Sequence, residues 1–599
     1  MILEDIIMKK SKRFAALLTA GLLALVPCAM ASVSLTAFAS TLTVTDTDES
    51  AHTYNAYQII TGTKDTAGNL SAMEWGDGVD SAKLITALNA KAPDLGIDPL
   101  GADATINQVA AQLAKINAPD KIQLLAKVFN EEDVLDKTAV KPMTKNGSNY
   151  TTADVPDGWY LVCDETDPLV TGNVTTGVRV KSANLLQVVG DTTVVAKHSL
   201  PTVDKKIIEG SEKVDANTAS IGDVVTYEIT TESPDVTGYD KYYFVLNDTL
   251  SKGLTYNDTL TVSYGPNNTV EPAISQTNFT LDSDGAATAQ TGDYYLVQGT
   301  YDETNGTELK IVFEDCVNLF KNIPAGTPIT VTYKAILNEN AVITDAGNPN
   351  TVNLQYSNNP NATTDGTSEP ETPDEPKPNA PTGVTPDEVV KTYTTALKLH
   401  KVDNKGTTLT GASFRITGDG VNKVVVAGTM FVADAAGTYY KLDDGTYTET
   451  RPESATDETP KYKKVTSQTI EEDSANNVNV EAFVDESGYV TFTGLGDGDY
   501  TISEIVVPDG YQKASDVTIK IESAPTLSAP NWTVTKDSTD ELTRNETFQY
   551  AFNVVNTQFS NLPTTGGMGT KLFYLFGGLL AVGSCIVLVT KKRMSGVEK

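Results

Sequence analysis

The chain has little of what enzymes and cysteine-based scaffolds are built from. Its 599 residues include three histidines and four cysteines, which leave little material for histidine-based catalysis or a cysteine-rich metal site. Basic residues are also scarce, at 45 against 78 acidic residues, and the net charge of −33 argues against a nucleic-acid binder. The 40% hydrophobic and 7% aromatic content is typical of folded protein. The length predicts about four units of roughly 150 residues, processing segments included.

The N-terminus has the pattern of a secretion signal. A basic cluster that ends at Arg13 precedes an apolar run over 14–30, and Ala37-Phe38-Ala39 forms a small-residue cleavage site. A transmembrane anchor is the alternative, but the run is short and leads into that site. We therefore expect export, with Ser40 as the first mature residue.

The C-terminus combines a short motif, an apolar span and a basic tail. The motif consists of Leu562, Pro563, Thr564, Thr565 and Gly566. The span over 572–590 can cross a bilayer as a helix, and the basic residues that follow hold the tail inside. This arrangement resembles the cell-wall sorting signal of Gram-positive surface proteins, which is read by a sortase. The resemblance implies cleavage after Thr565 and transfer of its acyl group to an amine; a simple membrane-anchored ectodomain is the alternative.

Between the two ends the chain is mainly β. Helical periodicity is confined to residues 81–135, inside an α+β region, and two later regions alternate apolar and polar residues between Gly, Asn and Asp turns. We expect tandem Ig-like or CnaB-like β-sandwich modules after the α+β domain. The predicted order is a signal peptide (1–39), an N-terminal α+β domain (40–198), a middle β-sandwich (199–360), a Pro-rich acidic linker (361–390), a C-terminal β-sandwich (391–560), and the sorting signal with its transmembrane helix and basic tail (561–599).

Three polar residues of the C-terminal domain lie an even number of positions from apolar residues of the same strand, so they face the same side of the sheet. Lys401 is in phase with Leu399 in one strand, and Glu504 and Asn556 are likewise in phase with apolar residues of theirs. Each alone has an ordinary reading as an edge lysine, a rim carboxylate or a turn asparagine. Together they predict a lysine, a glutamate and an asparagine that point into one core.

The surrounding motifs resemble the collagen-adhesin B-type module of Gram-positive pilins and adhesins. They are K-V-D-x-x-G-x-x-L-x-G-A-x-F from Lys401, Y-x-x-x-E ending at Glu504, and P-x-G-Y from Pro508. The resemblance implies an isopeptide bond between Lys401 and Asn556, promoted by Glu504. Burial favours a neutral amine, which can attack the amide carbon, and a protonated carboxyl group, which can shuttle protons as ammonia leaves. An unreacted buried salt bridge is the alternative.

The middle domain repeats the pattern. Lys205 and Asn350 are in phase with apolar neighbours, whereas Lys206 and Asn353 fall on the opposite face. Asp248 ends an apolar strand, where it could otherwise cap a turn. This arrangement resembles the middle domain of major pilins, in which Lys, Asp and Asn form the bond, and it implies these roles for Lys205, Asp248 and Asn350.

The first domain has threonines where its opening strand would need a lysine, so we expect no such bond there. Its end reads Val194-Val195-Ala196-Lys197-His198. This stretch resembles the V-Y-P-K-N-like strand of major pilins in its lysine, but not in the tyrosine, proline or asparagine. The resemblance implies that Lys197 attacks the sortase-held Thr565 of another subunit; an ordinary exposed strand-end lysine is the alternative.

The combined prediction is a backbone (shaft) pilin, a structural protein without cofactor or metal, displayed in a fimbria anchored to the cell wall. The expected partners are a sortase, identical subunits, minor pilins, peptidoglycan and a host surface or matrix, and not nucleic acid. A monomeric wall-anchored adhesin, or a tip or base pilin, is the runner-up. A secreted enzyme comes third, because His52, His198 and His400 lie in strand contexts without a nearby nucleophile motif.

Overall fold

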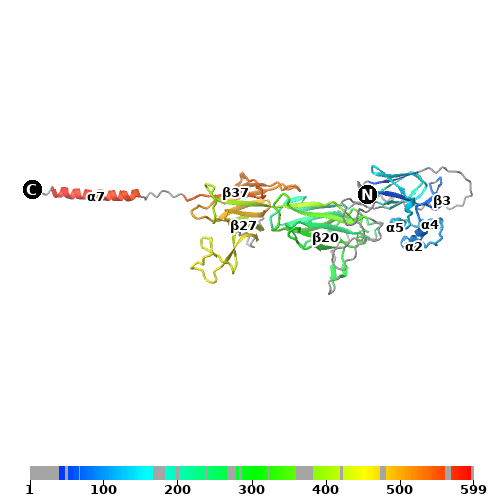
Figure 1. The fold of residues 1–599 in the computed structure, drawn as a ribbon, viewed down its shortest axis with the longest axis horizontal. Coiled ribbons are helices and arrows are strands. Elements are labelled where there is room, and N and C mark those ends of the chain that lie inside the picture. Colours follow the sequence, from blue (N-terminus) through cyan, green and yellow to red (C-terminus); the bar gives the residue numbers. More distant parts are fainter. Residues whose placement is uncertain are drawn as a thin grey trace. The chain divides into compact units, whose positions relative to one another are not determined.

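The structure is a computed structural model coloured along the chain in Figure 1. It describes residues 40–46, 52–66, 68–131, 133–165, 183–196, 201–236, 239, 241–265, 278–281, 287–321, 323–358, 382–418, 423–471, 481–559 and 568–594. The predicted class is confirmed, since strands dominate and helices gather in the first domain. The chain divides into two compact units, one of residues 1–394 with 523–532 and one of residues 395–522 with 533–599.

The first domain combines two sheets with a group of short helices. One sheet has the strand order β5-β6-β1-β9, and the other has β3-β2-β7-β8. The elements are β1 (Ser40–Thr45), β2 (Tyr54–Lys64), β3 (Leu70–Trp75), α2 (Ser81–Ala90), α3 (Ala92–Leu95), α4 (Ile106–Leu113), α5 (Pro119–Phe129), β4 (Lys141–Pro142), β5 (Thr144–Asn146), β6 (Asn149–Val155), β7 (Gly158–Asp164), β8 (Ala183–Val188) and β9 (Thr192–Val195).

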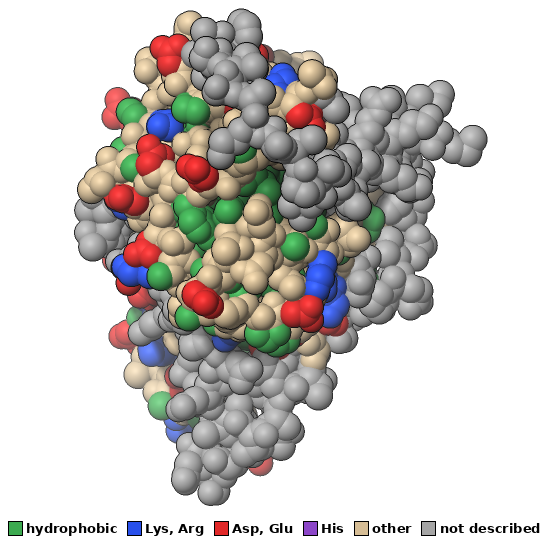
Figure 2. All heavy atoms as spheres, turned by 90° about the vertical axis from the view of Figure 1, so that its right-hand side faces the viewer, with side chains coloured by type: hydrophobic (Ala, Val, Ile, Leu, Met, Phe, Trp, Pro, Cys, Tyr) green, Lys and Arg blue, Asp and Glu red, His purple; other side chains and the backbone are tan. Residues whose placement is uncertain are grey.

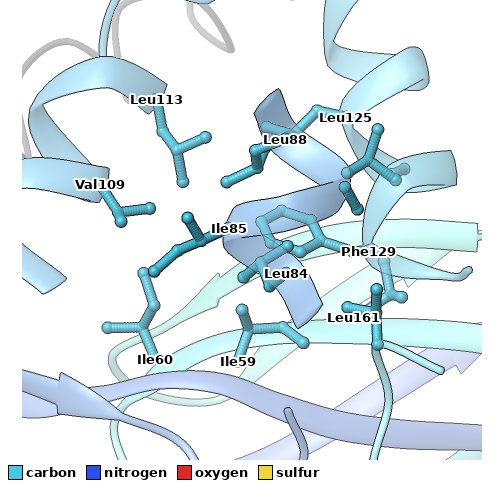
Figure 3. Packing of buried hydrophobic residues seen from close by; sticks show 14 of the residues in the cluster. Ile59, Ile60, Leu84, Ile85, Leu88, Val109, Leu113, Leu125, Phe129 and Leu161 are labelled. Atoms are coloured by element: carbon cyan, nitrogen blue, oxygen red, sulfur yellow. The ribbon is translucent and has the colours of Figure 1, made fainter. Parts of the chain in front are cut away.

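The helices cover one sheet through a continuous apolar core. Asp80 begins α2 by accepting hydrogen bonds from the backbone of Ala82 and Lys83. Figure 3 shows side chains of α2, α4 and α5 packed onto those of β2 and β7, with Leu84 facing Ile59. Burial of this apolar face is what stabilises helices as short as these.

The described part of the first domain contains a small apolar pocket. This pocket lies between the helices and the sheet and has a volume of only about 30 Å³. Its lining residues are Ile59, Ile60, Met73, Ala110, Leu113, Leu125, Phe129, Trp159 and Leu185. Figure 2 shows hydrophobic side chains grouped near the middle of one face, with acidic side chains scattered around them.

The middle domain is a sandwich of two sheets. One sheet has the order β11-β10-β13-β21-β15, and the other has β12-β24-β22-β14-β20-β19. The elements are β10 (Val203–Glu209), β11 (Glu212–Val214), β12 (Ala216–Thr218), β13 (Val224–Glu232), β14 (Phe244–Leu250), β15 (Leu254–Tyr256), β16 (Thr261–Tyr264), β17 (Asn278–Leu281), β18 (Ala287–Thr291), β19 (Tyr294–Gln298), β20 (Thr307–Phe313), α6 (Cys316–Phe320), β21 (Pro328–Leu337), β22 (Asn348–Ser357), β23 (Thr382–Val384) and β24 (Glu388–Tyr393).

The last two strands of this sandwich lie where the sequence predicted the linker and the start of the next domain. Both β23 and β24 pair with β22, so residues 382–384 and 388–393 belong to the middle sheet. The prediction of a linker over 361–390 followed composition, whereas β24 is rich in the strand-forming residues Val, Thr and Tyr and pairs with β22.

The C-terminal domain has one long strand path, β36-β35-β34-β33-β26-β31-β27-β32-β25-β37. Its first strand, β25, lies between β32 and β37 and runs parallel to β37. The elements are β25 (Thr395–Asp403), β26 (Ser413–Gly418), β27 (Lys423–Ala433), β28 (Tyr440–Lys441), β29 (Tyr447–Thr448), β30 (Tyr462–Glu471), β31 (Ala482–Phe483), β32 (Tyr489–Leu495), β33 (Gly498–Val506), β34 (Val517–Glu522), β35 (Thr533–Lys536), β36 (Asp540–Glu541) and β37 (Tyr550–Asn556).

The last described element is a long helix, α7 (Met568–Met594). Within it, Lys571–Met594 has a mean hydropathy of 2.4 and is long enough to cross a membrane. The last helical turn carries Lys591, Lys592 and Arg593. This agrees with the span and basic tail read from the sequence. The predicted signal peptide and the Leu562–Gly566 motif lie outside the described residues, as does Lys197.

Candidate isopeptide sites

The C-terminal domain brings its three predicted residues together in the core. Lys401 lies on β25, Glu504 on β33 and Asn556 at the end of β37. All three are at most 1% exposed. Strands β33 and β37 alternate buried and outward residues, which turns Glu504 and Asn556 to the same interior as their apolar neighbours.

The contacts join the amine, the amide and the carboxyl group. Lys401 Nζ lies 2.5 Å from Asn556 Oδ1 and donates to the Val554 carbonyl at 3.0 Å. Asn556 Nδ2 donates to Glu504 Oε1 at 2.9 Å, and Glu504 Oε2 accepts from the Ala514 backbone at 2.7 Å. Burial lowers the pKa of Lys401 to about 8, although the Glu504 charge opposes that shift. The amine is thus easier to deprotonate beside the amide that it would attack.

The middle domain assembles its set from both sheets. Lys205 lies on β10 of one sheet, whereas Asp248 on β14 and Asn350 on β22 come from the other. Lys205 Nζ contacts Asp248 Oδ2 and lies 2.6 Å from Asn350 Oδ1. All three residues are at most 1% exposed. Asp248 is therefore a core residue of a strand and not a turn cap.

Burial acts on both charged groups of the middle set. It lowers the pKa of Lys205 to about 8, against the opposing effect of the Asp248 charge. It also raises the pKa of Asp248, while the Lys205 charge and the hydrogen bonds from Lys205 and Tyr333 act in the opposite direction. Both shifts favour a neutral amine beside a protonated carboxyl group, the protonation states that the condensation needs.

The residues assigned to the outer face lie there. Lys206 forms ion pairs with Asp204 at 2.7 Å and Asp215 at 2.8 Å. Asn353 donates to Asp387 Oδ1 at 2.8 Å in an exposed contact. The alternation of β10 and β22 thus separates the lysine and asparagine of the core from their neighbours.

The sequence analysis missed one member of the middle set, Tyr333. Its hydroxyl lies 3.0 Å from Lys205 Nζ, 2.9 Å from Asp248 Oδ1 and 2.6 Å from Asn350 Nδ2. The available signal was the alternation of β21, which buries Tyr333 in phase with Val331 and Ala335. A buried tyrosine hydroxyl requires a polar partner, so this position pointed to a polar group in the core.

The described part of the first domain holds a buried polar cluster around His52. His52 Nδ1 lies 2.6 Å from Asp164 Oδ2, and His52 Nε2 lies 3.7 Å from Asp46 Oδ2. The His52 side chain is fully buried and cannot reach a substrate, which argues against the enzyme alternative.

The described cysteines of the first and middle domains, Cys163 and Cys316, are buried free thiols. Among the described residues, no group of three His, Cys, Asp or Glu side chains could hold a metal ion.

Two family matches fall within the two domains that hold these sites. Residues 221–360 match the Gram-positive pilin backbone subunit 2, Cna-B-like domain. Residues 395–533 match the SpaA prealbumin-like fold domain.

Individual proteins are also similar to this chain. The trypsin-resistant surface T6 protein of Streptococcus pyogenes serotype M6 is 27% identical over 425 residues, or 67% of this chain and 70% of the relative. The solved T6 backbone pilin of S. pyogenes aligns with a TM-score of 0.50 at 17% identity, over 88% of this chain and all of that chain. The major pilin SpaD of Corynebacterium diphtheriae aligns with a TM-score of 0.38 at 15% identity, over 87% and 98% of the two chains.

The first match includes Asp248 and Asn350 but begins after Lys205, and the second includes Lys401 and Glu504 but ends before Asn556. Residues 221–360 and 395–533 are therefore similar to domains of Gram-positive pilins, and the chain as a whole is similar to the T6 backbone pilin in fold.

Proposed function

We propose that this chain is the shaft subunit of a covalently polymerised surface pilus, and that isopeptide bonds Lys401–Asn556 and Lys205–Asn350 stiffen it. The observation that carries the proposal is the occurrence of two fully buried Lys-acid-Asn sets in separate domains of pilin-backbone type. Two buried charged sets would be expensive to keep unreacted, because desolvation of an ion pair offsets much of its attraction.

The positions of the two bonds suit a subunit under tension. Lys401 lies on the first strand of its domain and Asn556 on the last, 155 positions apart. Lys205 and Asn350 are 145 positions apart and join the two sheets of the middle domain. A bond at each place would carry force past the intervening chain. By analogy with disulfides, closing a loop of this size contributes about 5 kcal/mol of stability in the chain-entropy model.

The remaining partners follow from the sequence motifs. A sortase would cleave after Thr565 and transfer it to Lys197 of another copy or, at the base of the fibre, to peptidoglycan. Minor pilins would complete the fibre and a host surface or matrix would be its target. The chain would then be held at the cell wall, and the apolar α7 supports a membrane-held stage before sorting.

The test is the intact mass of denatured residues 40–561. Each closed bond releases one ammonia and lowers the mass by about 17 Da. We expect two such losses, one absent in Lys401→Ala and the other absent in Lys205→Ala. If the unsubstituted chain has the full mass expected without any loss of ammonia, the cross-link proposal is overturned and a monomeric wall-anchored adhesin is favoured.

A further inference from the structure

The two proposed sites differ in the group that lies beside the amide nitrogen of the asparagine. In the C-terminal site, the Glu504 carboxyl group reaches the amide nitrogen of Asn556 directly, at 2.9 Å. In the middle site the acid is an aspartate, one methylene shorter, and the group beside the amide nitrogen of Asn350 is the Tyr333 hydroxyl, at 2.6 Å. The same hydroxyl lies 2.9 Å from the Asp248 carboxyl group. Tyr333 thus fills the gap between the acid and the leaving group.

We propose that Tyr333 is a catalytic residue of the middle-domain condensation and passes a proton from Asp248 to the departing nitrogen of Asn350. This inference rests on the proposed Lys205–Asn350 bond and adds a third acid–base group to it. Tyr333 qualifies by contact, because its hydroxyl touches both the attacking nitrogen and the leaving nitrogen.

The step balances as a proton relay. It begins with a neutral Lys205 amine and a protonated Asp248. Nζ attacks the Asn350 amide carbon and forms the new C–N bond, and a proton from Nζ moves to Asp248 Oδ2, which Nζ already contacts. Asp248 gives its own proton through Oδ1 to the Tyr333 oxygen, and Tyr333 gives its proton to Nδ2. The C–Nδ2 bond breaks, ammonia leaves, and Asp248 and Tyr333 end in their starting protonation states.

The surroundings of Tyr333 suit this role. The residue is fully buried between Tyr227, which stacks on it at 5.4 Å, and Tyr256 at 6.0 Å. Burial raises the pKa of Tyr333 well above 10, so the hydroxyl keeps its proton until the relay draws it away. In the described C-terminal domain, no hydroxyl group is hydrogen-bonded to Lys401, Glu504 or Asn556. The relay is therefore specific to the middle site.

The test follows bond closure in the full chain as it is made. The full-length protein is synthesised in a cell-free system, samples are quenched with acid at intervals, and a protease digest is analysed by mass spectrometry for the cross-linked peptides. Tyr333→Phe keeps the ring and removes only the hydroxyl. Because a positioned acid–base group contributes roughly 10²–10⁴-fold, we expect the Lys205–Asn350 peptide to form at least about 100-fold more slowly in this variant.

Two controls separate catalysis from folding. In Tyr333→Phe the Lys401–Asn556 peptide must form at the unsubstituted rate, since that site has no tyrosine. Tyr256→Phe removes a neighbouring tyrosine hydroxyl, which accepts from the Leu260 backbone at 3.3 Å, and should leave both rates unchanged. Formation of the Lys205–Asn350 peptide at the unsubstituted rate in Tyr333→Phe would overturn the relay. Absence of that peptide from the unsubstituted chain would instead overturn the proposed bond itself.

Discussion

At the scale of single residues, both sites depend on side-chain direction. A strand turns successive side chains to opposite faces, so Lys205 enters the core while Lys206 meets Asp204 and Asp215 outside. Parity within each strand was enough to select the lysines and asparagines. The role of Tyr333 could not be predicted in this way, because a tyrosine in phase with apolar residues is typical of any hydrophobic core. Its hydrogen-bond partners also come from three other strands.

The pKa of Lys401 makes a pH-dependent prediction for chains in which the bond cannot form. In Asn556→Ala the amine stays free, and burial holds its folded-state pKa at about 8, below the ordinary lysine pKa of 10.5. Between these two values the unfolded chain binds a proton that the folded chain does not. The free energy of unfolding should therefore rise with pH across this window, by up to about 3 kcal/mol.

Lys401→Ala is the matched control for this measurement. It also lacks the bond, but it has no amine to titrate at this position. Both variants are unfolded with denaturant at pH 7.5 to 10.5. The free energy of unfolding of Asn556→Ala should rise with pH relative to that of Lys401→Ala. Parallel pH curves for the two variants would show that the lysine is not buried as a free amine.

At the scale of elements, β37 is the strand that the C-terminal bond would secure. It lies at the end of the strand path and pairs with β25 alone among the described strands of that path. A terminal edge strand frays readily, because one row of its backbone groups is unpaired. A bond at Asn556 would hold its last residue to β25.

We expect Lys401→Ala to increase hydrogen exchange across β37. Without the bond, the strand can open locally, so its amides should exchange at least about tenfold faster than in the unsubstituted chain, while those of β34 change little. The control is Lys398→Ala, on the same strand with its amine over the Tyr489 ring at 4.7 Å. Equal protection of β37 in the unsubstituted chain and in Lys401→Ala would contradict this role for the bond.

Element boundaries were less accessible from the sequence than element types. The alternating segments before and after the acidic stretch were correctly read as strands. That β24 closes the middle sheet, and does not begin the next domain, depends on its pairing with both β22 and β12. Such long-range pairing leaves no local signal in the sequence.

At the scale of the whole molecule, the candidate cross-links identified among the described residues lie in the middle and C-terminal domains. The first domain relies on apolar packing and on the buried cluster of His52, Asp46 and Asp164. Covalent reinforcement would thus be concentrated in the two domains that match pilin-backbone families.

This division predicts separate thermal transitions. Lys205→Ala should lower the midpoint of the middle domain, and Lys401→Ala that of the C-terminal domain, each by roughly 10–20 °C. The first domain should keep its midpoint in both variants. Calorimetry of residues 40–561 measures all three, and a single transition shifted equally by either substitution would contradict independent reinforcement.

The proposed covalent link between Thr565 of one subunit and Lys197 of the next can be tested in cells. Lys197→Ala and Thr565→Ala should each abolish the ladder of covalent multimers that denaturing gels of cell-wall extracts would show for a shaft subunit. Lys213→Ala, which removes an exposed lysine paired with Glu228, should leave the ladder intact. A persistent ladder in Lys197→Ala would assign the acceptor to another lysine, and a single band in unsubstituted cells would favour the wall-anchored adhesin.

The sequence by itself determined the mainly β class and the inward direction of each lysine and asparagine, because strand alternation is a local property. It also determined the apolar C-terminal span. Only the tertiary structure decided that Lys205, Asp248 and Asn350 meet across two sheets, that Tyr333 lies among them, and that β24 belongs to the middle domain. These facts depend on strand order and on pairing between distant segments, which arise only when the whole chain packs.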